Sequence, residues 1–247
     1  MDVVKRRLDP RSYVKLVGSV EGCCVAPLAA LWTSPPASVV RWDLAANAYP
    51  APSGRKGPVV FAGSFNPPHH GHMEIIRYLS KAFSEVHIVI GMNPNKNFGC
   101  ISWTCRLLHR SPCSKRRAIY PVSPETRKQI IEQALPFIGA GNAKVWVWGD
   151  VIFKLAQHVG ASALYRGIRS WEEDGKAERY LEVQNICWPM ISTCGGPFGT
   201  YYVEAPPRYS FISSTLLRAR LKSGESIDDI VPACVAEAVR QAYDGKL

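Results

Sequence analysis

The 247-residue sequence contains no apolar run of about 18 residues, so it predicts no membrane-spanning helix. It also lacks a C-x-x-C pair, and the spacing of its eight cysteines resembles no zinc module. We interpret these cysteines as reduced thiols of a cytoplasmic protein, with no metal site. No secretory h-region and no internal repeat are present. The 47% of hydrophobic residues and 20% of charged residues are typical of a globular protein.

The net charge of +10 is concentrated in two parts of the chain. Residues 1–57 carry a net charge of +4 and residues 101–119 carry +5, whereas the remainder carries +1. A nucleic-acid enzyme is expected to have its basic face on the main domain. The distribution therefore argues against a nucleic-acid partner, although a non-catalytic nucleotide- or RNA-binding protein stays as a distant alternative.

Prolines and glycines between residues 34 and 58 indicate a linker or an irregular lead-in. Residues 1–57 are therefore predicted to be an N-terminal extension whose deletion leaves activity largely unaltered. The basic residues in it keep a mitochondrial or plastid targeting role open, but its acidic residues are unusual for a transit peptide. Residues 58–247 are predicted to form the main domain, with an inserted basic loop at about 97–121.

Apolar runs and helical spacings alternate through this domain. Serines with an acidic residue behind them mark helix starts at Ser123 and Ser170. Such alternation predicts an α/β fold, a doubly wound, Rossmann-like parallel sheet of five strands with helices on both faces. The expected strands are Val59–Ala62, Val86–Ile90, Lys144–Trp148, Ala161–Tyr165 and Thr200–Val203. The expected helices are 72–83, 123–135, 151–158, 170–186, 213–222 and 233–243.

Polar residues follow four of the expected strands, where ligands bind in open parallel sheets. They include imidazoles, a lysine, two arginines and a hydroxyl-rich helix start, which together suit a polyphosphate. Each group alone has an ordinary explanation, such as a helix cap, a solvated lysine or an ion-paired turn, so their joint placement is the informative feature. The segments are Gly63–His72, Asn93–Lys96, Arg166–Arg169 and Tyr209–Thr215.

Two of these segments resemble the signatures of the nucleotidylyl transferase superfamily. The first is Gly63-Ser64-Phe65-Asn66-Pro67 with His69-His70-Gly71-His72, of the H-x-G-H type, and the second is Ile212-Ser213-Ser214-Thr215. Within the superfamily, Leu164–Arg169, Pro94–Lys96 and Val231-Pro232 resemble phosphopantetheine adenylyltransferase. The similarity covers about residues 58–247, apart from the insert.

The resemblance implies a reaction of coenzyme A synthesis. ATP and 4′-phosphopantetheine, in the presence of Mg²⁺, give dephospho-coenzyme A and pyrophosphate. A homo-oligomer is compatible with it, because bacterial members of the family are hexamers. The acceptor phosphate is already anionic, so the protein needs to supply positioning and charge stabilisation rather than a base.

The resemblance also implies residue roles. His72, His69 and Lys96 are expected to be catalytic, and the acceptor is expected to contact Ser64, Lys96, Ile152 and Arg166. The expected ATP contacts are Ser64, Phe65, His72, Gly167, Ile168, Arg169, Glu178, Tyr209, Ser210, Phe211, Ile212, Ser213, Ser214 and Thr215.

Some features keep alternatives open. The glutamate that contacts the nucleotide is either Glu178 or Glu182. A nicotinamide or nicotinate mononucleotide adenylyltransferase fits the first segment and an I-S-S-T-x-x-R segment ending at Arg218 equally well. The R-G-I-R sequence from Arg166 favours the phosphopantetheine enzyme, since mononucleotide enzymes usually lack it.

Overall fold

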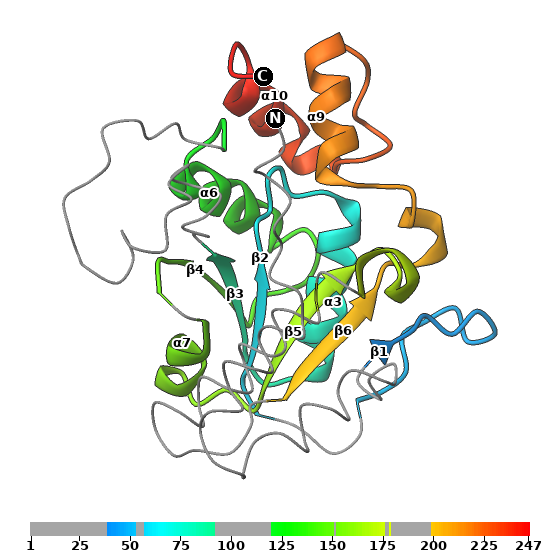
Figure 1. Ribbon diagram of the computed structural model, residues 1–247, viewed down its shortest axis with the longest axis vertical. Helices are drawn as coiled ribbons and strands as arrows, with labels where there is room; N and C mark the ends of the chain where they lie inside the picture. Colours follow the sequence, from blue (N-terminus) through cyan, green and yellow to red (C-terminus); the bar gives the residue numbers. More distant parts are fainter. Residues whose placement is uncertain (1–38, 53–56, 92–119, 151, 176–177, 179–198) are drawn as a thin grey trace, which may run out of the picture. The chain divides into compact units, whose positions relative to one another are not determined.

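A computed structural model describes residues 39–52, 57–91, 120–150, 152–175, 178 and 199–247 (Figure 1). The predicted site residues Lys96 and Glu182 and nearly all of the predicted insert lie outside these described residues. The chain divides into two compact units, Met1–Val39 and Val40–Leu247, and all described helices belong to the second. No helix within the described ranges is both long and apolar enough to cross a bilayer.

A parallel sheet forms the centre of the fold, as the alternation of strands and helices predicts. The described strands lie in the order β1-β6-β5-β2-β3-β4, and β6 to β4 run parallel. Their number is six rather than the predicted five, because the short β1 adds to the edge. The strands are β1 (Val39–Val40), β2 (Val59–Gly63), β3 (Val86–Gly91), β4 (Ala143–Trp148), β5 (Ala163–Ile168) and β6 (Thr200–Glu204).

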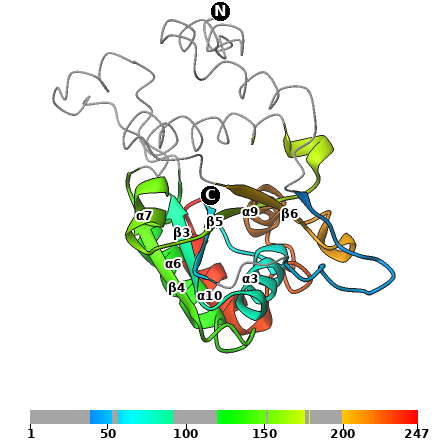
Figure 2. The same cartoon turned by 90° about the horizontal axis from the view of Figure 1, so that it is seen from below.

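Helices cover both faces of the sheet, which confirms the predicted class. One face packs against α3, α6, α9 and α10 in the larger apolar cluster, and α3 and α10 lie on the same side in Figure 2. The other face packs Val60, Val89 and Leu164 against Leu155 of α7. The helices are α3 (His70–Ala82), α6 (Pro124–Ala134), α7 (Ile152–His158), the short 3-10 helix η1 (Pro207–Tyr209), α9 (Ser214–Ser223) and α10 (Ala233–Tyr243).

Serine caps explain where several helices begin. Ser123 Oγ accepts from Thr126 N at 3.1 Å at the start of α6, with Pro124 in the first position. Ser170 Oγ accepts from Glu173 N at 3.2 Å, and residues 171–175 are helical. The predicted continuation of this helix to Ile186 lies outside the described residues.

Strand β5 is longer than its sequence pattern predicts. Arg166, Gly167 and Ile168 were expected in a turn, but they pair with β6 and belong to the strand. Gly167 is closely packed, because a Cβ atom here would lie 2.9 Å from Ile75 Cδ1 of α3 and would force that side chain to shift. Thus the glycine permits close packing between strand and helix, which is a structural role beside its predicted contact with the nucleotide.

Residues 39–52, which fall in the predicted extension, are folded onto the edge of the sheet. Besides contributing β1, they place Arg41 Nε at 3.3 Å from Glu204 Oε2. The hydroxyl of Tyr49 donates to Glu204 O at 2.7 Å. These contacts attach the segment to the carboxyl end of β6.

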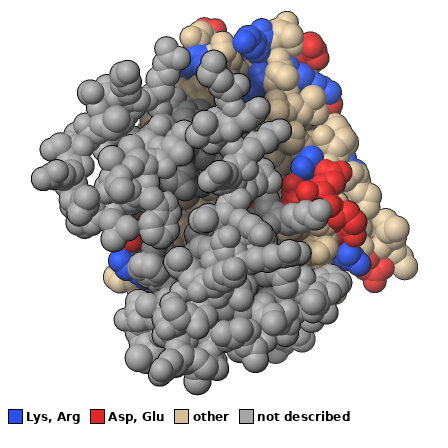
Figure 3. Space-filling model, viewed as in Figure 1, with Lys and Arg blue, Asp and Glu red and all other residues tan. Residues whose placement is uncertain are grey.

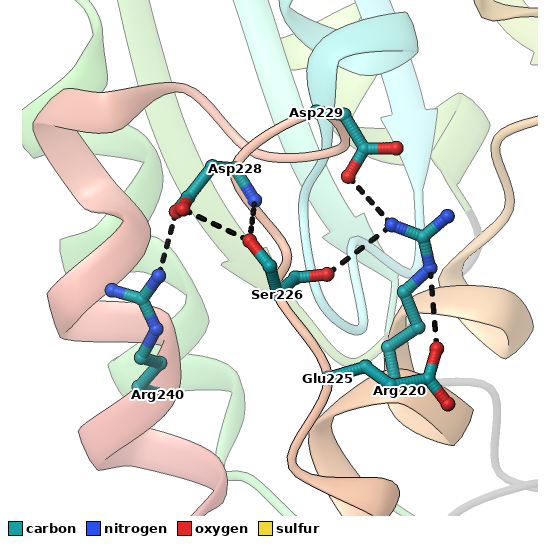
Figure 4. Close-up of polar contacts among 6 residues, drawn as sticks. All are labelled: Arg220, Glu225, Ser226, Asp228, Asp229 and Arg240. Carbon is teal, nitrogen blue, oxygen red and sulfur yellow. Dashed lines mark hydrogen bonds and ion pairs between the residues drawn. The ribbon is translucent and has the colours of Figure 1, made fainter.

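An ion-pair cluster fixes the loop between α9 and α10 (Figure 4). Arg220 Nη1 donates to Asp229 Oδ1 at 2.6 Å, and Arg240 Nη2 donates to Asp228 Oδ1 at 2.6 Å. The next carbonyl, Ile230 O, accepts from His70 N at 2.8 Å in the first turn of α3. The cluster therefore helps to position the start of the histidine-bearing helix.

Candidate active site

The site lies where the strand order reverses. Strand β2 pairs with β3 on one side and with β5 on the other, which creates the crevice that binds ligands in this class of sheet. Phe61 of β2 pairs with Tyr165, so Arg166 lies near the carboxyl end of β2. The segments after β2 and β5 are therefore brought to one edge, as the sequence predicts.

The segment after β2 makes a tight turn just before the histidines at the start of α3. Phe65 has a φ of 46° and a fully buried ring, and Gly63 is packed so closely that a Cβ atom would lie 2.9 Å from that ring. The same ring meets His72 edge to face, with 4.9 Å between the centroids. The side chain of Phe65 thus packs against the imidazole of His72 and supports its position.

Two imidazoles stand together at the start of α3. The rings of His69 and His72 are 3.7 Å apart between centroids, and His69 N donates to His72 Nδ1 at 3.3 Å. Because Nδ1 accepts this bond, the ring proton of neutral His72 is on Nε2. Nε2 has no hydrogen-bond partner among the described residues and is therefore a donor ready for a ligand.

Burial keeps both imidazoles neutral at physiological pH. It lowers the pKa of His72 to about 3. Burial, with additional effects of His72 and His70, lowers the pKa of His69 well below its ordinary value. His69 Nδ1 is buried and has no partner within the described chain. This atom faces the first turn of α3, where the backbone of His72 approaches the His69 side chain and a Cβ atom on Gly71 would lie 3.2 Å from Nδ1.

Two arginines fix the backbone between β2 and α3. Arg127 of α6 is fully buried and donates from Nη1 to Ser64 O and from Nε to Ser123 O at 3.3 Å. Arg218 of α9 donates to Asn66 O at 2.5 Å. Sequence reasoning missed Arg127, although it occupies the apolar stripe of its helix, three residues before Ile130, where an exposed arginine is not expected.

The start of α9 is attached to the same loop. Ser214 Oγ donates to Pro67 O at 2.9 Å, so the predicted hydroxyl-rich segment and the predicted histidine segment lie next to each other. Ser213 Oγ accepts from Leu216 N at 3.1 Å and caps the helix. Thr215 Oγ1 accepts from Arg218 at 3.1 Å. The free N–H groups and the dipole of this helix start favour an anion.

The cations after β5 are held by carboxylates. Arg166 makes a bidentate ion pair with Glu178, in which Nη2 lies 3.1 Å from Oε1. Both side chains are largely buried, with 22% and 13% of their areas exposed. Arg169 pairs with Glu173 and Asp174, each at 2.7 Å. Arg169 thus forms the ion-paired turn that is the ordinary alternative to its predicted contact with ATP.

The remaining predicted residues differ in whether their side chains or only their backbone atoms are accessible to a ligand. Phe211 is 55% exposed, and Tyr209 stacks on His70 with 5.2 Å between the ring centroids. Ser210 Oγ donates to Pro207 O at 2.9 Å. Ile212 and Ile168 are buried, so only their backbone atoms are available for a contact with ATP. Ile152 Cδ1 lies 3.9 Å from where a Cβ atom of Gly91 would be, at the end of β3.

Charged groups on the visible described surface are mixed in sign. In Figure 3, blue and red side chains lie side by side along the described edge. Arg41, for example, pairs with both Glu172 and Glu204. This view of the described surface therefore shows no continuous basic face of the kind that nucleic-acid binding requires.

The fold and these segments together define an α/β nucleotidyltransferase. The cytidylyltransferase-like family matches residues 60–220, and the chain belongs to this family. The phosphopantetheine adenylyltransferase of Finegoldia magna is 25% identical over 191 residues, which span 77% of this chain and 99% of the relative. That of Streptococcus pneumoniae is 28% identical and spans 73% of this chain and 93% of the relative.

One similar solved structure is a protein of Vibrio parahaemolyticus named as a nicotinate-nucleotide adenylyltransferase. It has a TM-score of 0.47 and 16% identity, and the match covers 76% of this chain and 93% of that one.

Proposed function

We propose that this protein transfers the adenylyl group of ATP to 4′-phosphopantetheine and releases pyrophosphate. Membership of a nucleotidyltransferase family supports the transfer of a nucleotidyl group. The names of the relatives from Finegoldia magna and Streptococcus pneumoniae support phosphopantetheine as the acceptor. The Arg166–Arg169 sequence, which mononucleotide enzymes usually lack, favours the same acceptor.

The reaction is an in-line displacement at the α-phosphorus of ATP. An oxygen of the acceptor phosphate forms the new P–O bond, and the bond to the β-phosphate oxygen breaks. Pyrophosphate leaves with the electron pair, and the product is dephospho-coenzyme A. Because the attacking oxygen is already anionic, the protein needs to align the reactants and stabilise charge on the α-phosphate.

The free Nε2–H donor of His72 is the observation that carries this proposal. The bond from His69 N to Nδ1 fixes the tautomer, and burial keeps the ring neutral. A donor held in place before the reaction costs no reorganisation when charge builds on the α-phosphate. His69 lies beside it, with 3.7 Å between the ring centroids, and we assign to it a second contact with the triphosphate.

The β- and γ-phosphates are assigned to the start of α9. Ser213 is committed to capping, and Ser214 to the Pro67 carbonyl. We therefore assign the phosphate contacts to the backbone N–H groups of this first turn, with Thr215 beside them. Mg²⁺ is taken to enter with ATP, as part of the substrate.

Arg166 and Lys96 are the proposed ligands of the acceptor phosphate. Nε and Nη2 of Arg166 bind Glu178, whereas Nη1 has no partner in the described part of the chain. Glu178 thus orients the guanidinium, and Nη1 remains for a phosphate. Ile152 is assigned to the pantetheine chain because it lies at the end of β3, next to Gly91.

Pyrophosphate release distinguishes the possible acceptors. The full chain is incubated with Mg²⁺–ATP and either 4′-phosphopantetheine or a nicotinamide or nicotinate mononucleotide. We expect release with phosphopantetheine and formation of dephospho-coenzyme A. Release only with a mononucleotide would show that the acceptor assignment is wrong.

A further inference from the structure

Residues 39–52 precede the region that matches the family, yet they contact β6, α3 and Arg208. Figure 1 shows this blue segment beside β6. The ring of Tyr49 packs on Trp42 and on Tyr78 of α3, with 4.8 and 4.6 Å between the centroids. The segment is therefore joined to α3 as well as to the end of β6.

Arg208 connects this aromatic group to the site. Its Cζ lies 5.9 Å from the ring centroid of Trp42 and 4.7 Å from that of Tyr209, both within the range of cation–π contacts. Its Nη2 donates to Glu74 Oε2 at 3.1 Å. Tyr209 in turn stacks on His70, with an angle of 6° between the rings.

The 3-10 helix that contains Arg208 and Tyr209 is short, and of its three residues Tyr209 packs against the apolar core. None of these residues is fully buried, and residues 210–212 connect the helix to Ser213, the capping serine of α9. A short exposed turn of this kind samples many conformations unless neighbouring side chains restrict it. Restricting it before the ligand binds reduces the entropy lost on binding.

We propose that residues 39–52 form a positioning segment for nucleotide binding, in which Trp42 holds Arg208 and thereby fixes Tyr209 against His70. The inference rests on the proposed function for one point, the assignment of residues 209–215 to the nucleotide. It reverses the expectation that residues 1–57 are dispensable. Removal of residues 1–38 should leave nucleotide binding unchanged, whereas the loss of residues 39–52 should weaken it.

Equilibrium binding of Mg²⁺–ATP to the full chain tests the proposal by calorimetry. We expect Trp42→Ala to raise the Kd for ATP about fivefold, a coupling typical of side chains in one network. The KM for the acceptor and kcat should change less, and Trp42→Phe should restore most of the affinity. Leu44→Ala is the matched control because Leu44 belongs to the same segment and is 76% exposed.

A second variant keeps the aromatic group intact. Arg208 is largely exposed, so Arg208→Gln is expected to fold, and it removes the cation between Trp42 and Tyr209 together with its ion pair to Glu74. It should raise the Kd for ATP to a similar extent, and combining it with Trp42→Ala should add little. If Trp42→Ala and Arg208→Gln both bind ATP as tightly as Leu44→Ala does, the proposal is overturned.

The outcomes for the two proposals are separable. If the wild type binds ATP but does not adenylylate phosphopantetheine, the proposed function fails, and a weakened Trp42→Ala variant still supports the positioning segment. If transfer occurs and the variants bind ATP normally, only the positioning segment is refuted. A wild type that binds no ATP would overturn both.

Discussion

The two segments that flank the switch point hold their polar groups in different ways. After β2, neutral imidazoles are aligned by the backbone of their own helix start, and Arg127 and Arg218 secure the loop from other elements. After β5, Arg166 and Arg169 are each paired with carboxylates. One segment presents donors that are free of counter-ions, and the other presents cations that are already neutralised.

The difference indicates two ways of receiving an anion. The segment after β2 can meet a charge that develops during the reaction without exchanging partners. The segment after β5 has to share or exchange carboxylates when a phosphate arrives, so its contribution depends on Glu178 as much as on Arg166. Substitutions in the first segment should therefore reduce turnover, and those in the second should reduce substrate affinity.

The largest effect is expected from His72→Ala. Loss of the Nε2–H donor should lower kcat at least about 100-fold, the scale seen when one transition-state donor is removed. The circular dichroism spectrum should stay that of the wild type. His158→Ala is the control because His158 is exposed at the end of α7. Near-normal turnover of His72→Ala would remove this side chain from the mechanism.

Arg166→Ala should act mainly on the acceptor. It removes the proposed phosphate ligand and leaves Glu178 largely buried and unpaired, so we expect the KM for phosphopantetheine to rise about thirtyfold. Arg169→Ala should have a smaller effect because Arg169 is more exposed, at 45% of its side-chain area. Lys144→Ala, which breaks an exposed ion pair with Glu85 at the amino end of β4, away from the site, is the control. Equal KM values for phosphopantetheine in the Arg166 and Lys144 variants would show that Arg166 does not bind the acceptor.

Acid stability tests the neutral state of the imidazoles. The folded pKa of His72 is about 3, below the ordinary value of 6.5, so the unfolded chain binds an additional proton between these values. The free energy of unfolding should therefore fall as the pH falls through this window. From pH 7 to 5.5, the free energy of unfolding should fall by about 1 kcal/mol less in His72→Gln than in the wild type, because the substitution removes this proton linkage.

Denaturant titrations at the two pH values measure the difference. His158→Gln, a matched substitution of an exposed histidine, is the control. An identical pH dependence for His72→Gln and the wild type would indicate that His72 titrates normally in the folded protein.

The sheet was predictable because its strands carry strong local signals. Val59–Ala62 and Val86–Ile90 are apolar runs that end at polar or glycine-containing segments, and both lie in the central strands β2 and β3. Their parallel arrangement follows from the helices between them. By contrast, β1 contains two residues and depends on contacts with β6, so no local pattern identifies it.

The site was predictable as a set of segments but not as a set of partners. The sequence places His72, Arg166 and Ser214 after strands or at helix starts, which topology brings to one edge. It does not indicate that Arg166 pairs with Glu178, or that Arg127 reaches Ser64 across 63 positions, because these contacts depend on tertiary packing. The roles of Trp42 and Tyr49 likewise depend on how the edge of the sheet is covered.

Ser214→Ala should have the smallest of these effects and tests how the loop and α9 act together. The hydroxyl binds Pro67 O rather than capping the helix, so its loss should loosen the connection between the two segments. We expect the KM for ATP to rise about fivefold, the cost of one hydrogen bond of about 1 kcal/mol, with little change in Tm.

Ser213→Ala should instead lower the Tm, because it removes the cap of α9. Ser223→Ala, at the other end of the same helix, is the control for both. If Ser214→Ala has the same KM for ATP as Ser223→Ala, the start of α9 binds phosphates without the bond from Ser214 to Pro67. The preorganised groups of the segment after β2 would then be His69 and His72 alone.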